Sequence, residues 1–242
     1  VCEGVDIVCR SFLNPGDEVI LPEPAYVCYR PLIELSGGKV VSIDTSSSQF
    51  VPLAAQIEAA ITNKTKMIML SYPNNPTGQS IPFSELSKIA ELAVKHKLLI
   101  LTDEIYAALS FEPFKSIAEI AAVKPNVIYL NGFSKAYSMT GWRIGYICAD
   151  LEYIDAMNKI HQYSALCAPT LSQYAAVEAC KNSEKDVVKM MQSYQERALY
   201  FTNMMNEVGL ETVMPQGGIY CFTSVKKLGL TSLEFAEKLI KE

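Results

Sequence analysis

Short apolar segments alternate along this chain with longer amphipathic ones, and this alternation limits the possible folds more than any other feature. We expect strands at Val19–Leu21, Val40–Ile43, Met67–Leu70, Leu98–Leu101, Val127–Leu130 and Ile144–Ala149. Helices are expected between them at Val27–Ser36, Leu53–Ala60 and Phe83–His96. Strands that are buried on both faces read as continuous apolar runs, and parallel strands need helical crossovers. The sequence therefore predicts an α/β fold, a mostly parallel sheet with helices on both faces.

The loop between the last two expected strands holds a lysine and an arginine eight residues apart, in Asn-Gly-Phe-Ser-Lys-Ala-Tyr-Ser-Met-Thr-Gly-Trp-Arg-Ile-Gly-Tyr. Lys135 lies so close to the core that its charge costs free energy unless it is neutralised or paired. A Schiff base with an aldehyde neutralises a lysine and makes it catalytic. Arg143 and Ser134 supply a planar fork and a hydroxyl that suit a phosphate. These groups indicate a site for a phosphorylated aldehyde such as pyridoxal 5′-phosphate.

This segment resembles the lysine-attachment motif of the class I pyridoxal-phosphate aminotransferases. The residues that match the motif are Gly132, Ser134, Lys135, Ser138, Gly141, Arg143 and Gly145. The resemblance implies that Lys135 carries the cofactor and moves the proton during transamination. It also implies that Ser134 and Arg143 bind the cofactor phosphate.

Two further segments match family motifs that contact the cofactor ring. Tyr-Pro-Asn-Asn-Pro-Thr-Gly follows the strand Met67–Leu70, where open α/β sheets place ligands. The resemblance implies that Asn75 donates to the cofactor's 3′ oxygen. Near the start of the chain, Tyr26 takes the place of the family's aromatic residue that stacks on the ring, although it could also be ordinary packing at a helix start.

A carboxylate follows the expected strand Leu98–Leu101 in the segment Thr-Asp-Glu-Ile-Tyr. Asp103 could be a helix N-cap, or it could pair with a cation, because a buried unpaired carboxylate is costly. The resemblance implies that Asp103 pairs with the protonated pyridine nitrogen, and that Tyr106 shares the 3′ oxygen with Asn75. We expect Glu104 to be structural.

The composition argues against several other classes of function. The 242 residues include 21 basic and 26 acidic side chains that are well mixed, which does not suit nucleic-acid binding. The seven cysteines form no metal-binding pattern and indicate free thiols in a reducing cytoplasm. No apolar run approaches the roughly 18 residues of a membrane span.

The resemblance covers the family's large domain and the beginning of its small α+β domain. Residues 1–185 are expected to form the large domain, which binds the cofactor, and residues 186–242 a linking helix and part of the small domain. Helices are expected at Leu151–Cys167, Leu171–Lys181, Glu184–Val208 and from Ser232, with short strands at Glu211–Val213 and Ile219–Thr223. Both ends read as interior to helices, so we expect a longer protein and a chain that is impaired as a catalyst by itself.

Three functions remain open on the sequence alone. The first is transamination between an amino acid and a 2-oxo acid in amino-acid metabolism, by a cytoplasmic homodimer. The second is a pyridoxal-phosphate carbon–sulfur lyase, and the third a non-catalytic sensor domain of a transcription regulator. The residues around Lys135 and the segment His161-Gln-Tyr163 resemble bacterial aminotransferase A and aromatic aminotransferases, which indicates aromatic or acylated diaminopimelate-type amino donors. The same segment could simply pack a helix.

Overall fold

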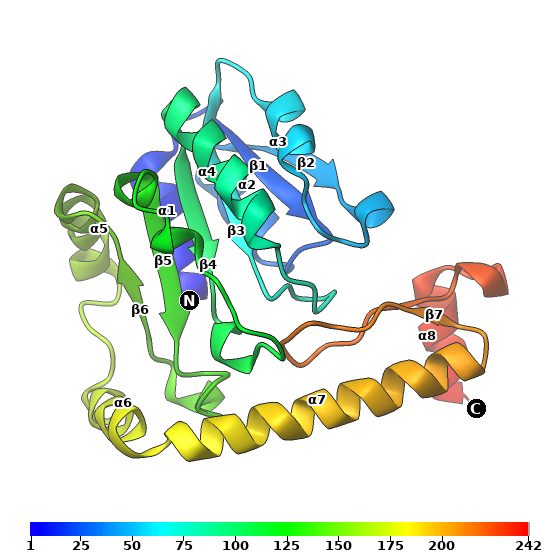
Figure 1. The fold of residues 1–242 in the computed structure, drawn as a ribbon. Coiled ribbons are helices and arrows are strands. Elements are labelled where there is room, and N and C mark those ends of the chain that lie inside the picture. The colour runs from blue at the N-terminus through cyan, green and yellow to red at the C-terminus, as the bar shows by residue number, and fades with distance from the viewer. Residues whose placement is uncertain (242) are drawn as a thin grey trace.

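A six-stranded sheet forms the centre of the molecule in the computed structural model, which describes residues 1–241 (Figure 1). The strand order is β2-β1-β3-β4-β5-β6. The first five strands are mutually parallel, and β6 alone runs antiparallel to its neighbour β5. The mostly parallel sheet is therefore confirmed. Its strands are β1 (Glu18–Glu23), β2 (Lys39–Asp44), β3 (Thr65–Ser71), β4 (Leu99–Asp103), β5 (Val127–Gly132) and β6 (Gly145–Cys148).

Helices cover both faces of this sheet, because its central strands are apolar on both sides. In β4, Leu99 and Leu101 belong to the core beneath α1 (Cys2–Phe12), α2 (Tyr29–Leu35) and α5 (Leu151–Ser164). Ile100, between them, belongs to the core beneath α3 (Ala54–Ala60) and α4 (Phe83–His96). Successive side chains of a strand point to opposite faces, so β4 contributes to both cores. These two cores fix the carboxyl ends of the strands relative to one another.

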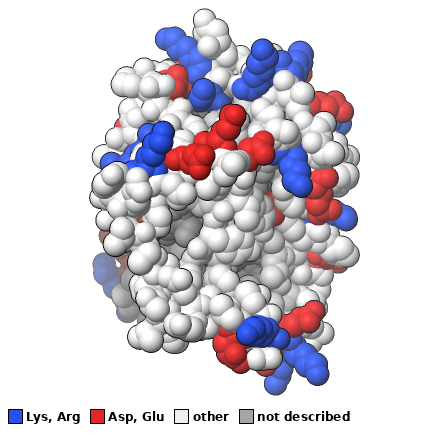
Figure 2. All heavy atoms as spheres, turned by 90° about the vertical axis from the view of Figure 1, so that its left-hand side faces the viewer, with Lys and Arg blue, Asp and Glu red and all other residues white. Residues whose placement is uncertain are grey.

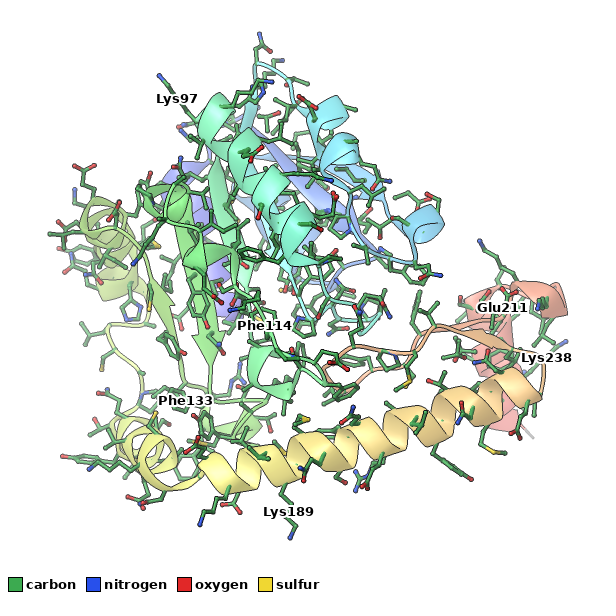
Figure 3. All side chains as sticks on the ribbon, viewed as in Figure 1. Lys97, Phe114, Phe133, Lys189, Glu211 and Lys238 are labelled. Atoms are coloured by element: carbon green, nitrogen blue, oxygen red, sulfur yellow. The ribbon has the colours of Figure 1, made fainter. Side chains whose placement is uncertain are left out.

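The chain after β6 leaves the sheet and becomes mainly helical. It forms α6 (Thr170–Asn182), α7 (Glu184–Glu207), the small β7–β8 hairpin (Glu211–Thr212 and Thr223–Ser224) and α8 (Ser232–Lys241). With 24 residues, α7 is about 36 Å long. Figure 1 shows it running past the lower edge of the sheet to the hairpin and α8, and Lys189 projects from its outer side in Figure 3.

Most expected elements are found within one or two residues of their bounds, and two differ in a way that the backbone explains. The predicted strand Ile219–Thr223 is only Thr223–Ser224, because residues 216–218 just before it bond to Gly78 and Leu109 and not to β7. The helix predicted to reach Cys167 ends at Ser164, since Leu166 has a left-handed φ of +66° that a helix cannot contain.

Residues 1–241 contain no membrane-spanning helix, no metal-binding cluster and no disulfide. No helix there is both long and apolar enough to cross a membrane. No group of His, Cys, Asp and Glu side chains in that range is arranged to hold a metal ion. All seven cysteines are free.

Candidate active site

A cavity of about 220 Å³ opens at the edge of the sheet where the parallel strands end. The seven site residues expected from the sequence all line it: Tyr26, Asn75, Asp103, Tyr106, Ser134, Lys135 and Arg143. The other lining residues are Val1, Cys2, Tyr29, Ile105, Thr140 and Tyr220. A larger hollow of about 440 Å³ lies between α7 and residues 218–221, and none of the seven lines it. The smaller cavity is therefore the one that gathers the predicted cationic, anionic and aromatic residues.

Lys135 enters the cavity from a tight loop after β5. The loop is closed by hydrogen bonds from the Ser138 amide to the Lys135 carbonyl and from the Met139 amide to the Phe133 carbonyl. Phe133 and Met139 pack against α6, and Figure 3 shows Phe133 beside that helix. The Lys135 ammonium lies 5.9 Å from the centre of the Tyr106 ring. No carboxylate of residues 1–241 is within ion-pair distance of the Lys135 ammonium, so no acidic side chain there neutralises it.

Asp103 is a buried carboxylate at the end of β4, with 3% of its surface exposed. It accepts hydrogen bonds from the Tyr29 hydroxyl at 2.7 Å and from the Ile105 amide at 3.1 Å. Burial raises its pKa above the ordinary value, although these two hydrogen bonds oppose the rise. No Lys or Arg side chain within residues 1–241 pairs with it. The cationic partner expected from the sequence is therefore not supplied by a side chain of this part of the chain.

The turn after β3 uses one of its two asparagines to hold its shape and presents the other to the cavity. Asn74 is buried, and its Oδ1 accepts from the Thr77 amide at 3.2 Å and the Thr77 hydroxyl at 3.0 Å. Its Nδ2 donates to the Ser71 carbonyl at 3.3 Å. Asn75, which makes none of these bonds, lines the cavity. Its amide is therefore available to a bound molecule.

Four tyrosines contribute aromatic rings to the lining of the cavity. Tyr26 meets Tyr29 edge to face, with ring centres 5.6 Å apart. Tyr106 meets Tyr220 in the same way at 5.9 Å, and their hydroxyls are 3.3 Å apart. Burial, followed by the bond to Tyr220, raises the pKa of Tyr106 well above its usual value. Tyr106 is therefore a protonated hydrogen-bond donor at neutral pH.

Several residues of the cavity lining suit an anion. Arg143 is exposed and donates from Nη1 to the Thr140 carbonyl at 2.8 Å, and no carboxylate of residues 1–241 pairs with it. Ser134 and the first turn of α1, through Cys2, line the same cavity. Guanidinium, hydroxyl and helix N-terminal amides are groups that bind phosphate.

Cys2 also lines the cavity, and its thiol has a lowered pKa. The Cys28 thiol donates to its sulfur across 3.9 Å, and its own Sγ lies 3.8 Å from the Tyr26 hydroxyl. The bond from Cys28 is the largest cause that lowers the pKa of Cys2, to about 5.

Two tyrosines that were not expected at the site bond directly to predicted site residues. Tyr29 bonds to Asp103 from 74 positions away, and Tyr220 bonds to Tyr106 from 114 positions away. Tyr29 carried one available signal, since it lies on the expected helix directly after the Tyr26 motif. The structure leaves His161-Gln-Tyr163 outside the cavity, with His161 Nδ1 3.2 Å from Glu3 and Tyr163 87% exposed.

The chain is similar to known proteins over almost its whole length. It is 46% identical over 242 residues to "Putative aminotransferase YugH" of Bacillus subtilis, covering 99% of this chain and 63% of that protein. It is 41% identical over 241 residues to "Probable N-acetyl-LL-diaminopimelate aminotransferase" of the same organism, covering 99% and 61%. The crystal structure of an aromatic aminotransferase from Pyrococcus horikoshii matches with a TM-score of 0.95 and 35% identity, covering 100% of this chain and 66% of that one.

These matches agree on the family. The chain spans less than two thirds of the length of the three proteins just described. The family described as "Aminotransferase class I and II" matches residues 1–242. That match agrees with the lysine motif around Lys135 and with the fold. The chain belongs to the class I and II aminotransferases.

Proposed function

We propose that the protein transfers amino groups between an amino acid and a 2-oxo acid, with Lys135 as the residue that carries the cofactor and moves the proton. The observation that carries this proposal is the gathering of seven motif residues around one cavity. The relatives described above are named as aminotransferases, which favours amino transfer over the lyase and sensor alternatives.

The family's cofactor is pyridoxal 5′-phosphate, and the charges of the cavity fit it. Asp103 is buried without a cationic side chain, and a protonated pyridine nitrogen would supply that charge. Arg143 has no carboxylate partner in residues 1–241, and a phosphate would supply the negative charge that it lacks. Lys135 lines the same cavity and would be the amine for the aldehyde. The cofactor therefore satisfies three groups that the protein leaves unsatisfied.

When bound, pyridoxal 5′-phosphate supplies an aldehyde that condenses with amines and a ring that draws electrons from the bonds at the substrate's Cα. Lys135 would be the amine that holds the cofactor, and its Nζ, once free, would take and move the proton from the substrate's Cα as the general base. Asp103 would pair with the ring nitrogen and favour its protonated form.

The remaining site residues hold the cofactor in register with Lys135. Asn75 and Tyr106 would donate to the 3′ oxygen, and Tyr26 would pack on the ring face. Ser134 and Arg143 would bind the phosphate, with Arg143 as the charged partner. These are the roles that the seven residues' chemistry and placement support.

An assay with 2-oxoglutarate and a panel of amino donors tests the proposal. The panel should include aromatic amino acids, aspartate and N-acetylated diaminopimelate, the donors indicated by the sequence segment at 161–163 and by the relatives' names. Amino transfer to 2-oxoglutarate should appear with at least one donor and vanish in Lys135→Ala. Lys189→Ala, on the outer side of α7, is the matched control and should keep the activity. Release of a thiol or ammonia in place of a new amino acid would favour the lyase.

We also propose that the protein works as a cytoplasmic homodimer. Large apolar side chains are exposed on and just before α6: Tyr163, Leu166, Leu171, Tyr174 and Val177. Figure 2 shows that the side carrying α5 and α6 has a broad, hollowed area without charged side chains. An apolar area of this kind typically marks a protein interface. Light scattering that gives the mass of one chain would contradict the dimer.

The two-domain division also remains a proposal, with residues 1–185 as the large domain and 186–242 as a linking helix and partial small domain. It is supported by the long α7, of whose residues few are buried, and by the position of β7 and α8 away from the sheet (Figure 1).

A further inference from the structure

Residues 214–220, which we name the strap, return from the C-terminal region and lie against the cavity. The amides of Gln216 and Gly217 donate to the Gly78 carbonyl at 2.8 and 3.1 Å. On the other side, the Gly218 amide donates to the Leu109 carbonyl at 3.1 Å. The strap is thus hydrogen-bonded both to the turn that carries Asn75 and to the segment that follows Tyr106. Figure 1 shows it as the orange segment that reaches the green part of the chain after β4.

At two positions the strap packs so closely against its neighbours that only glycine, which has no Cβ, fits. A Cβ at Gly78 would lie 2.4 Å from Cβ of Pro215, and Gly78 also has a left-handed φ of +70°. A Cβ at Gly217 would lie 2.9 Å from Cγ of Pro73 and 2.9 Å from Cα of Ser110. Separations this short would force the backbone apart. The glycines therefore allow a close approach that fixes the strap relative to both motifs.

This approach brings one residue of the strap into the cavity. Tyr220 lines the cavity, and its hydroxyl accepts a hydrogen bond from the Tyr106 hydroxyl at 3.3 Å in this structure. The two rings meet edge to face with centres 5.9 Å apart, so packing as well as hydrogen bonding holds the pair.

A tyrosine hydroxyl carries one proton, and this limits what Tyr106 can do. If Tyr106 donates to the cofactor's 3′ oxygen, it cannot also donate to Tyr220. Tyr220 must then turn its own proton toward the Tyr106 oxygen. A hydroxyl that accepts one hydrogen bond becomes a better donor in the next, because the chain of bonds polarises.

We propose that Tyr220 is a positioning residue that donates to the Tyr106 hydroxyl and so aims the Tyr106 proton at the cofactor's 3′ oxygen. This inference rests on the proposed role of Tyr106. It makes the C-terminal region a contributor to the electronic state of the cofactor, through the strap. A displacement of the strap would weaken that hydrogen bond without moving any residue of the large domain.

The test is a spectroscopic pH titration of the bound pyridoxal 5′-phosphate, at saturating cofactor, in Tyr220→Phe. Losing the hydrogen bond should raise the apparent pKa of the cofactor's absorbance change by about half a unit, the worth of one neutral hydrogen bond. Tyr106→Phe should give a larger rise, and the double variant no more than Tyr106→Phe alone. Tyr194→Phe is the matched control, because Tyr194 packs against the same cluster as Tyr106 but lies outside the cavity lining.

The outcomes separate this inference from the function on which it rests. A Tyr220→Phe titration that coincides with Tyr194→Phe and the wild type would overturn the inference while Tyr106 keeps its role. Shifts that add in full in the double variant would also overturn it, since Tyr220 would then act independently of Tyr106. If Tyr106→Phe leaves the titration unchanged, the role of Tyr106 fails and the inference with it. Amino transfer itself is judged by the Lys135→Ala assay, which does not depend on either tyrosine.

Discussion

Two neighbouring carboxylates at the end of β4 lie on opposite faces of the sheet and have different environments. Asp103 faces the side of α1 and α2, where it borders the cavity and accepts from Tyr29 at 2.7 Å. Glu104 accepts from the Ser116 hydroxyl at 2.7 Å and the Thr102 hydroxyl at 3.1 Å, and it lines no part of the cavity. Both are buried, with 3% and 2% of their surfaces exposed.

The two faces of the sheet place one buried acid at the cavity and the other away from it. Burial raises the pKa of both acids, and that of Glu104 reaches about 7. Each acid accepts two hydrogen bonds from the protein, but Asp103 borders the cavity and Glu104 does not. Because successive side chains point to opposite faces, Asp103 can pair with a bound cation, whereas its neighbour Glu104 is structural.

The largest effect should come from neutralising the acid that faces the cavity. Asp103→Asn keeps the shape but removes a charge worth about 4 kcal/mol to a cation 4 Å away at an effective dielectric of 20. We expect amino transfer to fall by about three decades, while Glu104→Gln should change it less than tenfold. Steady-state rates of the two variants at saturating cofactor make the comparison. Equal losses in both would show that the two faces do not differ in function.

The acid on the other face should instead control stability. Because the folded-state pKa of Glu104 is raised from 4.5 to about 7, the folded protein binds a proton in that window that the unfolded chain releases. Stability from this group is complete below about pH 4.5 and is lost as the pH rises to about 7, by about 3 kcal/mol.

Urea unfolding of Glu104→Gln at pH 4.5 and pH 8 checks this sign. The variant should lose less stability than the wild type between the two pH values, since glutamine does not ionise. Some loss should remain, because Asp103 titrates in the same direction. Glu91→Gln, at an exposed position of α4, should follow the wild type. If Glu104→Gln lost as much unfolding free energy as the wild type between the two pH values, the pH dependence would come from groups other than Glu104.

The smallest effects should separate the two asparagines after β3 in the same manner. Asn74→Ala removes hydrogen bonds that close the turn and should cost about 1–3 kcal/mol of unfolding free energy. Asn75→Ala should leave the unfolding free energy nearly unchanged. It should raise the apparent pKa of the bound cofactor by about half a unit, because one donor to the 3′ oxygen is lost. Denaturation and absorbance titration of both variants make the test. A loss of stability in Asn75→Ala, or a pKa shift of the cofactor in Asn74→Ala alone, would contradict this assignment.

The sequence predicted the parts of the site that depend on local pattern. Apolar runs located the parallel strands, and motif residues directly after the runs reached one edge because parallel strands end together. The contacts of Tyr29 and Tyr220 were not predictable in this way, because they join segments far apart in the chain. The bounds of β8 were wrong for the same reason, since the strap bonds to Gly78 and Leu109 rather than to a strand.

The central claim is that the cavity face of the sheet holds pyridoxal 5′-phosphate on Lys135. Borohydride reduction of the protein with the cofactor, followed by peptide mapping, tests it most directly. We expect one fixed cofactor per chain, attached at Lys135, and none in Lys135→Ala beyond the background that Lys189→Ala shows at other lysines. A stoichiometric label on a different lysine, or an undiminished label in Lys135→Ala, would contradict the account.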